Sequence, residues 1–459
     1  MTSEVATRAT HAAQGGEELE RGLGPWGAIS ANVLNMVGVG PFITIPLAIA
    51  AMGGPQAMVG WVLGGFLCLC DGLVWAELGS ALPNSGGSYY YLQEAFGRES
   101  FGRLMSFLFL WQTLIVGPLT IASGAVGFSQ YMGFLHPGLS HAGALAIAAG
   151  VCLANAWLLY RNIRSIDRIT VAMTAIVIAT CCWVIVSGAL HFHASMAFDF
   201  TPGAFRMSRN FWMGLGATTL IAVYDYGGYS NACFLGGEIE RPNRNIPRAV
   251  IFSIFIVGAL YLLMNVSIIG SLDWKIAERS QAIAADFMQA VYGHWAGVLI
   301  SVLVLAVSFG SVFANMLGYS RIPYAAAAEG RFLAPFARLH NKGRFPTVSL
   351  LFMGIFSAVA CMFTLGELIK VLIVVQAIFQ FAAQCIAVEF LRRRQTAPAG
   401  RYRMPLYPIP AAIALAGWLY VAFSSGLHYV AIGLGTVAAG AGIYLFKARQ
   451  AQEWPFAAL

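Results

Sequence analysis

Two apolar segments of this 459-residue chain are each interrupted by a pair of glycines beside groups that could bind a small charged molecule. The first interruption reads Val37-Gly38-Val39-Gly40-Pro41-Phe42, and the second reads Tyr224-Asp225-Tyr226-Gly227-Gly228-Tyr229. Glycine permits an unwound backbone and lets a ligand approach the main chain closely. Inside a bilayer, unpaired backbone groups are tolerated only where they line a protected site. The two interruptions therefore predict a ligand site that is built largely from backbone.

The direction of the two segments sets the chemistry of such a site. If each segment is a helix in two halves, one half ends in free carbonyl groups, equivalent to roughly −0.5 charge, and the other begins with free N–H groups, equivalent to roughly +0.5. Carbonyl ends attract an ammonium group and N–H ends attract a carboxylate. Four such ends at one depth suit a zwitterion, of which an α-amino acid is the simplest. The residues expected in the site are Val37, Gly38, Val39, Gly40, Asp225, Tyr226, Gly227 and Gly228.

Several of these residues admit a second interpretation. The glycines could instead permit close helix–helix contact, and Tyr226 could be a packing residue with a hydrogen-bonded hydroxyl. A carboxylate inside a bilayer is costly and is by default a functional hypothesis. Asp225 could therefore recognise a cation or carry a coupling proton, or it could be a structural acid. Asp71 is a second such carboxylate, either a proton relay or a buried, hydrogen-bonded acid.

The elements that must position these residues are apolar and long. Hydrophobic residues make up 58% of the chain and charged residues 10%, with a mean hydropathy of +0.70, whereas soluble domains carry about 25% charged residues. Runs of about 18 apolar residues or more can cross a bilayer. Such runs predict an all-α integral membrane protein with about twelve transmembrane helices, at roughly 26–50, 57–80, 103–128, 141–160, 168–190, 211–236, 249–271, 295–320, 347–364, 366–390, 409–426 and 429–447.

Lys and Arg are distributed unequally between the two sides that these runs define. An even number of spans puts both termini on one side, and only Arg206, Arg209, Lys275 and Arg279 fall in the loops of the other side. The positive-inside rule therefore predicts cytoplasmic termini, with residues 1–24 and 448–459 as tails, in the plasma or inner membrane. The net charge of +7 reflects this asymmetry, and we expect no nucleic-acid partner.

The sequence contains none of the common signatures of catalysis or metal binding. The eight cysteines all fall in predicted spans, without a CxxC spacing. There is no Walker A, HExxH or GxSxG motif and no dinucleotide fingerprint. No enzyme activity, cofactor or metal is predicted.

Further stretches resemble the amino acid–polyamine–organocation superfamily of permeases. They are Ala76-Glu77-Leu78-Gly79, LPNSGGSYYYLQEAFG at 82–97, GGEIERPNRNIPRAV at 236–250 and SRIPYAAAAEGRFLAPFARLHNKGRFP at 320–346. Within the superfamily, FLFLWQTLIVGPLTIASG at 107–124 and YGGYSN at 226–231 look most like the L-type amino acid transporter branch. Pro41 and Asp225 depart from that branch, and the Gly-Pro-Phe sequence at 40–42 is also similar to plant-type polyamine carriers of the superfamily.

The resemblance implies the leucine-transporter fold within a transporter domain at 25–447. In that fold, two inverted repeats of five spans (about 26–190 and 211–391), of which spans 1 and 6 are broken, precede two accessory spans (about 409–447), and a central site is formed by spans 1, 3, 6, 8 and 10. Tyr224 aligns with an aromatic gate and Thr120 with a pocket-lining position. Ser308 and Ser311 stand where sodium-coupled relatives supply hydroxyls, although both could bond their own helix.

The function implied is a permease that moves amino acids across the membrane by alternating access. A polyamine or other organic-amine carrier of the same fold is the alternative, and a membrane sensor that has lost transport is a further one. Sodium symport, proton symport and ion-independent exchange all stay open, so H⁺ or Na⁺ is a candidate coupling ion.

Overall fold

The computed structural model describes residues 23–83, 86–160, 166–328, 330–340, 346–394 and 401–456. Residues 1–22 of the predicted tail at 1–24, residues 457–459 of the predicted tail at 448–459 and short parts of the quoted motifs lie outside these residues. The described chain is helical, with only isolated bridges at Leu23–Ile239 and Leu339–Pro346. The main helices are α2 (Pro25–Met36), α3 (Ile45–Met52), α4 (Met58–Ala81), α5 (Ser88–Phe96), α6 (Phe101–Leu135), α7 (His141–Leu159), α8 (Ile166–Leu190), α10 (Arg209–Tyr226), α12 (Pro242–Ile269), α14 (Ile283–Tyr292), α15 (His294–Ala328), α16 (Thr347–Ala360), α17 (Leu365–Gln376), α18 (Ala382–Arg393), α19 (Ile409–Ser424) and α20 (Leu427–Ala451).

Helices lie in all the predicted apolar runs, and the expectation of an all-helical membrane protein is confirmed. Seven helical stretches among the described residues are long and apolar enough to cross a membrane, and three shorter apolar helices accompany them. The segment from α17 to α18 is continuous but contains a π-helical turn, η4 (Ala377–Phe381). Single π turns inside α-helices are frequent at functional sites.

The first predicted interruption is a true break between two helices. α2 ends at Met36, Val37 leaves the helical region with φ −85° and ψ 83°, and the 3₁₀ turn η1 (Gly40–Phe42) precedes α3. The main chain is thus unwound from Val37 to Thr44, with a single 3₁₀ turn inside.

The second interruption differs from the prediction in its position and in the helix that comes after it. α10 continues through Tyr226, so Tyr224 and Asp225 lie in its last turn. The chain unwinds at Gly227 and Gly228. Gly228 has a φ of 113°, a backbone conformation that glycine adopts readily and other residues rarely adopt. The part of the predicted run at 211–236 that follows the break contains only the one-turn helix α11 (Asn231–Phe234). The apolar run extends past the end of α10 because hydropathy indicates which residues are buried and not which residues are helical.

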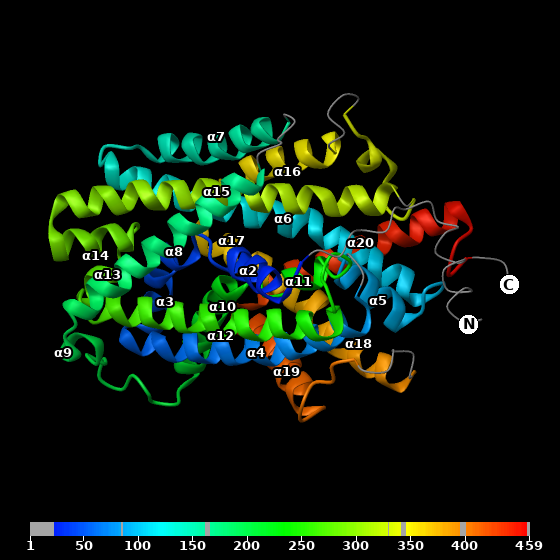
Figure 1. Cartoon of the computed structure of the whole chain (residues 1–459), viewed down its shortest axis with the longest axis horizontal. Coiled ribbons are helices and arrows are strands. Elements are labelled where there is room, and N and C mark those ends of the chain that lie inside the picture. The colour runs from blue at the N-terminus through cyan, green and yellow to red at the C-terminus, as the bar shows by residue number, and fades with distance from the viewer. Residues whose placement is uncertain are drawn as a thin grey trace.

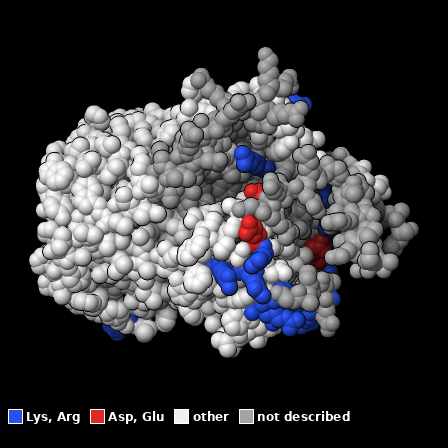
Figure 2. Space-filling model, viewed as in Figure 1, with Lys and Arg blue, Asp and Glu red and all other residues white. Residues whose placement is uncertain are grey.

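The two broken segments lie in the middle of the helix bundle. In Figure 1, α6 and α15 run side by side along one face and α4 and α12 along another, with α2, α10 and α11 between them. α19 packs on α4 and α10. Most Lys and Arg side chains visible in Figure 2 gather in the right-hand half of this face, while the left-hand half has almost none. The breaks thus lie between the two helix pairs.

Candidate functional site

A cavity of about 630 Å³ lies between the two breaks and extends along α15 toward the end of the molecule where α5 lies. One face of α15 lines it from Ser311 to Ala326. The predicted residues that line this cavity are Gly38, Val39, Gly40, Thr120, Tyr224, Asp225, Gly227, Gly228 and Ser311. Those outside its lining are Val37, Tyr226, Ser308 and Asp71. The fold thus brings most of the predicted site into one space.

The breaks present main-chain donors to this cavity. Val37 N–H bonds the Val33 carbonyl and Gly38 N–H bonds the Met36 carbonyl. Within the described part of the chain, the N–H groups of Val39 and Gly40 have no backbone acceptor, and the same holds for residues 228–230. Because η1 and α11 are only one turn long, these donors act as individual N–H groups rather than as ends of long helix dipoles. Pro41 contributes no donor.

Asn32 holds the second break against α2, and sequence reasoning missed it. Its fully buried amide donates from Nδ2 to the Tyr229 carbonyl at 2.5 Å and accepts at Oδ1 from Ala232 N–H at 2.7 Å. Asn231 Nδ2 returns a bond to the Ala31 carbonyl at 3.2 Å. An amide inside an apolar helix just before a glycine break, such as Asn32 or Asn35, is the signal that could have revealed it.

Asp225 meets Thr44 across the two breaks. Its Oδ2 lies 2.5 Å from Thr44 Oγ1, which is also 3.0 Å from the Gly40 carbonyl oxygen. Its Oδ1 is buried and has no hydrogen-bond partner within the described structure. This oxygen sits directly over Gly40, where a β-carbon would approach it to 2.2 Å. A side chain at position 40 would therefore have to displace this carboxylate.

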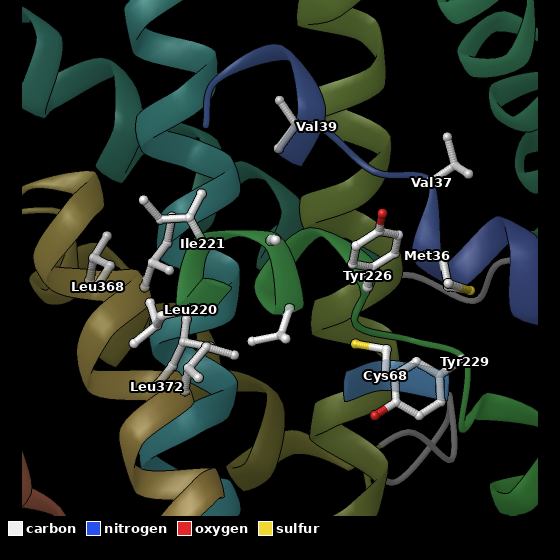
Figure 3. Packing of buried hydrophobic residues seen from close by; sticks show 14 of the residues in the cluster. Met36, Val37, Val39, Cys68, Leu220, Ile221, Tyr226, Tyr229, Leu368 and Leu372 are labelled. Carbon is white, nitrogen blue, oxygen red and sulfur yellow. The ribbon is translucent and has the colours of Figure 1, made fainter. Parts of the chain in front are cut away.

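The two predicted tyrosines of the second break have different surroundings. Tyr224 lines the cavity, and its hydroxyl lies 2.8 Å from Ser123 Oγ on α6. Tyr226 is fully buried outside the cavity against Trp61 and Tyr261, and its hydroxyl donates to the Trp61 carbonyl at 3.4 Å. Figure 3 shows Tyr226 among the residues of the buried hydrophobic cluster, while Val37 and Val39 lie on the connection between α2 and η1.

The candidate hydroxyls bond mainly to their own helices. Thr120 Oγ1 donates to the Val116 carbonyl at 2.8 Å, and Ser308 Oγ donates to the Val304 carbonyl at 2.8 Å. Ser311 lies beside the first break, since a β-carbon on Gly38 would be 3.1 Å from its Oγ. Ser311 is thus among the cavity-lining residues and Ser308 is not.

Asp71 does not line the cavity itself but bonds two residues that do. It is fully buried on α4, where Oδ2 accepts from Tyr229 Oη at 2.5 Å and Oδ1 accepts from Trp418 Nε1 at 2.9 Å. Tyr229 and Trp418 both line the cavity. Trp418, from α19, in turn stacks on Phe381 of η4 at 4.2 Å between ring centroids. Asp71 thus fixes two walls of the site.

A buried amide network that sequence reasoning also missed lines the cavity farther from the breaks. Gln112 Nε2 on α6 donates to Gln380 Oε1 at 2.6 Å. Gln380 Nε2, in η4, donates to Ser88 Oγ at 3.1 Å, and Gln384 Nε2 reaches the same oxygen at 2.6 Å. Glutamines inside apolar runs were the available signal. The network ties the π-helical turn to α5 beside the open end of the cavity.

Comparisons with known proteins agree with this architecture. A family model described as amino acid permease matches residues 23–440. The chain is 25% identical over 419 residues to a serine/threonine exchanger of Bacillus subtilis, covering 88% of this chain and 90% of that protein. It is 28% identical over 348 residues to the human large neutral amino acids transporter small subunit 2, covering 74% of this chain but 63% of that protein. It is also 28% identical over 351 residues to mouse Asc-type amino acid transporter 1, covering 72% of this chain and 63% of the relative.

The family match extends over nine-tenths of the chain and includes both breaks and every helix that lines the cavity. Its relatives are named as transporters and exchangers, which agrees with a bundle of apolar helices around a central cavity. The chain therefore belongs to the amino acid permease family of the amino acid–polyamine–organocation superfamily and is a membrane transport protein, not an enzyme.

Proposed function

We propose that the chain carries neutral amino acids across the plasma or inner membrane by alternating access. The cavity between the two breaks is the observation that supports this function most strongly, because it gathers unpaired N–H groups of both broken segments in one protected space. The names of the relatives, which refer to serine, threonine and large neutral amino acids, support neutral substrates.

In the proposed binding mode, the unwound backbone of the two breaks holds the substrate's charged groups. The N–H groups of Val39, Gly40 and residues 228–230 bind the carboxylate, and the ammonium group faces the carbonyl end of α2. Tyr224 and Thr120 line the same space from α10 and α6. The substrate side chain extends toward Gln376, Gln380 and Phe381, which line the cavity farther along.

The proposed architecture is the leucine-transporter arrangement. Spans 1–5 (26–190) and 6–10 (211–391) form inverted repeats within a domain at 25–447, α19 and α20 are accessory spans, and both termini are cytoplasmic. In this orientation the cavity opens toward the cytoplasm, because it extends from the breaks to α5 and the end of α15. The conformation described is therefore an inward-facing one.

An organic amine is the second candidate substrate. Asp225 supports it, since this carboxylate is among the cavity-lining residues and none of the ion pairs of the described residues includes it. Pro41 supports it as well, because it removes one donor from the proposed carboxylate cradle.

Thermal-shift measurements with the purified protein test the function and separate the two substrate classes. The panel contains the twenty amino acids, putrescine, spermidine and simple amines. A ligand that binds only the folded state raises its stability by RT ln(1 + [L]/Kd). Stabilisation by neutral amino acids, together with counterflow of the same radiolabelled compounds in proteoliposomes, is the expected result. Stabilisation by amines alone would replace the proposed substrate, and binding without counterflow would indicate a sensor.

A further inference from the structure

We propose that Asp225 and Thr44 form a proton-binding site that couples substrate transport to proton movement. This inference rests on the transport function proposed above and adds the identity of the coupling ion. The site joins the two broken segments, since Thr44 directly precedes α3 after the first break and Asp225 lies in the last turn of α10 before the second. Both side chains are at most 3% exposed.

The number of hydrogens on Thr44 makes this pair sensitive to a proton. A hydroxyl has one hydrogen to donate, but Thr44 Oγ1 lies within hydrogen-bond distance of two acceptors, the Gly40 carbonyl and Asp225 Oδ2. If Asp225 is ionised, Thr44 donates to Oδ2. If Asp225 carries a proton on Oδ2, it donates to Thr44 Oγ1, and the Thr44 hydrogen turns to Gly40. The same heavy-atom positions therefore accommodate both protonation states.

The surroundings of the other carboxylate oxygen favour a proton over a larger cation. Oδ1 has no hydrogen-bond partner within the described structure and faces the Cα of Gly40 so closely that a methyl group would not fit between them. The gap between Oδ1 and the Cα of Gly40 holds no additional atom, so a substrate ammonium group or a metal ion would have to approach this oxygen from another direction. A proton needs no additional space.

The charged and titratable groups around Asp225 leave it without a compensating cation among the described residues. Its titratable electrostatic partners are Tyr224 and Tyr226 on α10 and Tyr261 on α12. Of the other helices packed against α10, α4 carries Asp71 and Glu77, which bond Tyr229 and Arg392 respectively. α17 carries Glu367, which bonds Thr364, and Lys370, which lies over the Tyr429 ring. α3 and α19 carry no charged residue.

The proton has a route to and from this site. Asp225 and Gly40 both line the cavity, which extends to the end of α15. When Asp225 releases its proton into the water of this cavity, Thr44 turns its hydrogen from the Gly40 carbonyl to the carboxylate. The bond between the two broken segments then changes from acid-to-hydroxyl to hydroxyl-to-carboxylate. The strength of the bond that joins the two segments, and hence the equilibrium between conformations of the transporter, becomes dependent on one proton.

Proteoliposomes containing a trapped pH-sensitive dye test the proposal directly. L-Serine and L-leucine are added as probes, and dye acidification is measured beside counterflow of the same labelled amino acids. The wild-type protein is expected to acidify the lumen in proportion to net uptake. Asp225→Asn should keep counterflow but lose both acidification and accumulation driven by a pH gradient. Asp199→Asn is the control, because it neutralises an exposed carboxylate that bonds Trp274 and is not among the cavity-lining residues, and it should keep the wild-type ratio of acidification to net uptake.

Thr44 provides an independent readout. Thr44→Val keeps the shape of the side chain but removes the hydroxyl, so the pH profile of uptake should move away from that of the wild type, while Thr44→Ser restores it. If Asp225→Asn prevents transport altogether, a pH profile of Thr44→Val that differs from that of the wild type still supports the proposal. Identical pH profiles of Thr44→Val and the wild type overturn it. Counterflow without any substrate-dependent acidification in the wild type overturns the coupling and leaves the proposed function intact. Absence of counterflow for every amino acid would instead contradict the proposed function.

Discussion

Tyr131 fastens α6 to the first break, because its hydroxyl donates to the Phe42 carbonyl at 2.7 Å. The same oxygen accepts from Ala284 N–H of α14 at 3.2 Å, and the ring is fully buried. One phenol thus joins three elements at the side of the breaks away from the open cavity. In the proposed alternating-access cycle these elements separate in the outward-facing conformation, so we expect Tyr131 to stabilise the inward-facing one.

We expect Tyr131→Phe to shift the equilibrium toward the outward-facing state. The change removes two hydrogen bonds, each worth about 0.5–1.5 kcal/mol, and leaves Ala284 N–H unpaired. A loss of about 1.4 kcal/mol changes an equilibrium roughly tenfold. A cysteine placed at Val39, in a background lacking the exposed Cys182, should then react faster with an impermeant maleimide added to intact cells.

Tyr444→Phe is the matched control for this measurement. Its hydroxyl also donates to a carbonyl, that of Trp454 at 3.0 Å, but it joins segments near the C-terminus. It should leave the labelling rate at position 39 unchanged. Equal rates in the Tyr131→Phe and wild-type proteins would show that this tyrosine does not hold the outer side closed.

Gly40→Ala should abolish amino acid binding, and Gly40→Leu should do so as well. Even one methyl group at this position would lie 2.2 Å from Asp225 Oδ1 and must displace the carboxylate or the break itself. Loss of ligand-induced thermal stabilisation, with normal insertion and expression, is the expected measurement. Gly133→Ala is the control, since a β-carbon there meets nothing within 4 Å. Wild-type affinity in Gly40→Ala would move the substrate away from the first break.

The residues of the two breaks show which parts of the fold and the site can be predicted from the sequence. The glycines at 38, 40, 227 and 228 marked both breaks, because few other reasons place glycine pairs at matching points of apolar segments. The end of α10 was missed by a few residues, since hydropathy reports burial rather than helicity. The contacts of Asp225 with Thr44 and of Asn32 with Tyr229 join residues 181 and 197 positions apart. Such pairings depend on tertiary packing, which no local pattern encodes.

Tyr224→Phe should be tolerated better than Tyr224→Ala, as expected of a ring that covers the substrate. The hydroxyl of Ser123 donates to the Thr120 carbonyl at 2.7 Å, so Tyr224 is the donor in its bond to Ser123. Removing the phenol hydroxyl therefore leaves Ser123 satisfied and should cost about 0.5–1.5 kcal/mol. Removing the ring opens the cavity wall. The measurement is the substrate affinity of both variants from ligand-induced thermal shifts. Equal losses of affinity in Tyr224→Phe and Tyr224→Ala would show that the hydroxyl, and not the ring, is required.

Asp71→Asn should weaken the wall that α19 contributes to the cavity. An asparagine keeps one acceptor oxygen, but Tyr229 Oη and Trp418 Nε1 both donate to the carboxylate. One buried donor is left unpaired, at a cost of about 1–3 kcal/mol. The expected result is a lower unfolding temperature and a changed preference between L-serine and L-leucine. Trp418→Phe should reproduce the altered preference, because Trp418 supports Phe381. An unchanged preference in both variants would restrict Asp71 to a purely structural contribution.

Arg392→Ala should destabilise the protein far more than the adjacent Arg393→Ala. Arg392 makes a bidentate pair with Glu77, with both N–O distances 2.6 Å, and the Glu77 side chain is only 3% exposed. Removing one partner of a buried pair leaves an uncompensated charge and costs about 3–5 kcal/mol. Arg393 pairs with Glu389 at the surface, where such pairs contribute about 0–1 kcal/mol. Because Glu77 also accepts from Met404 N–H at 2.9 Å, the pair fastens the segment after α18 to α4. Apparent unfolding temperatures in detergent measure the difference, and similar values for the two variants would show that this contact carries little of the stability.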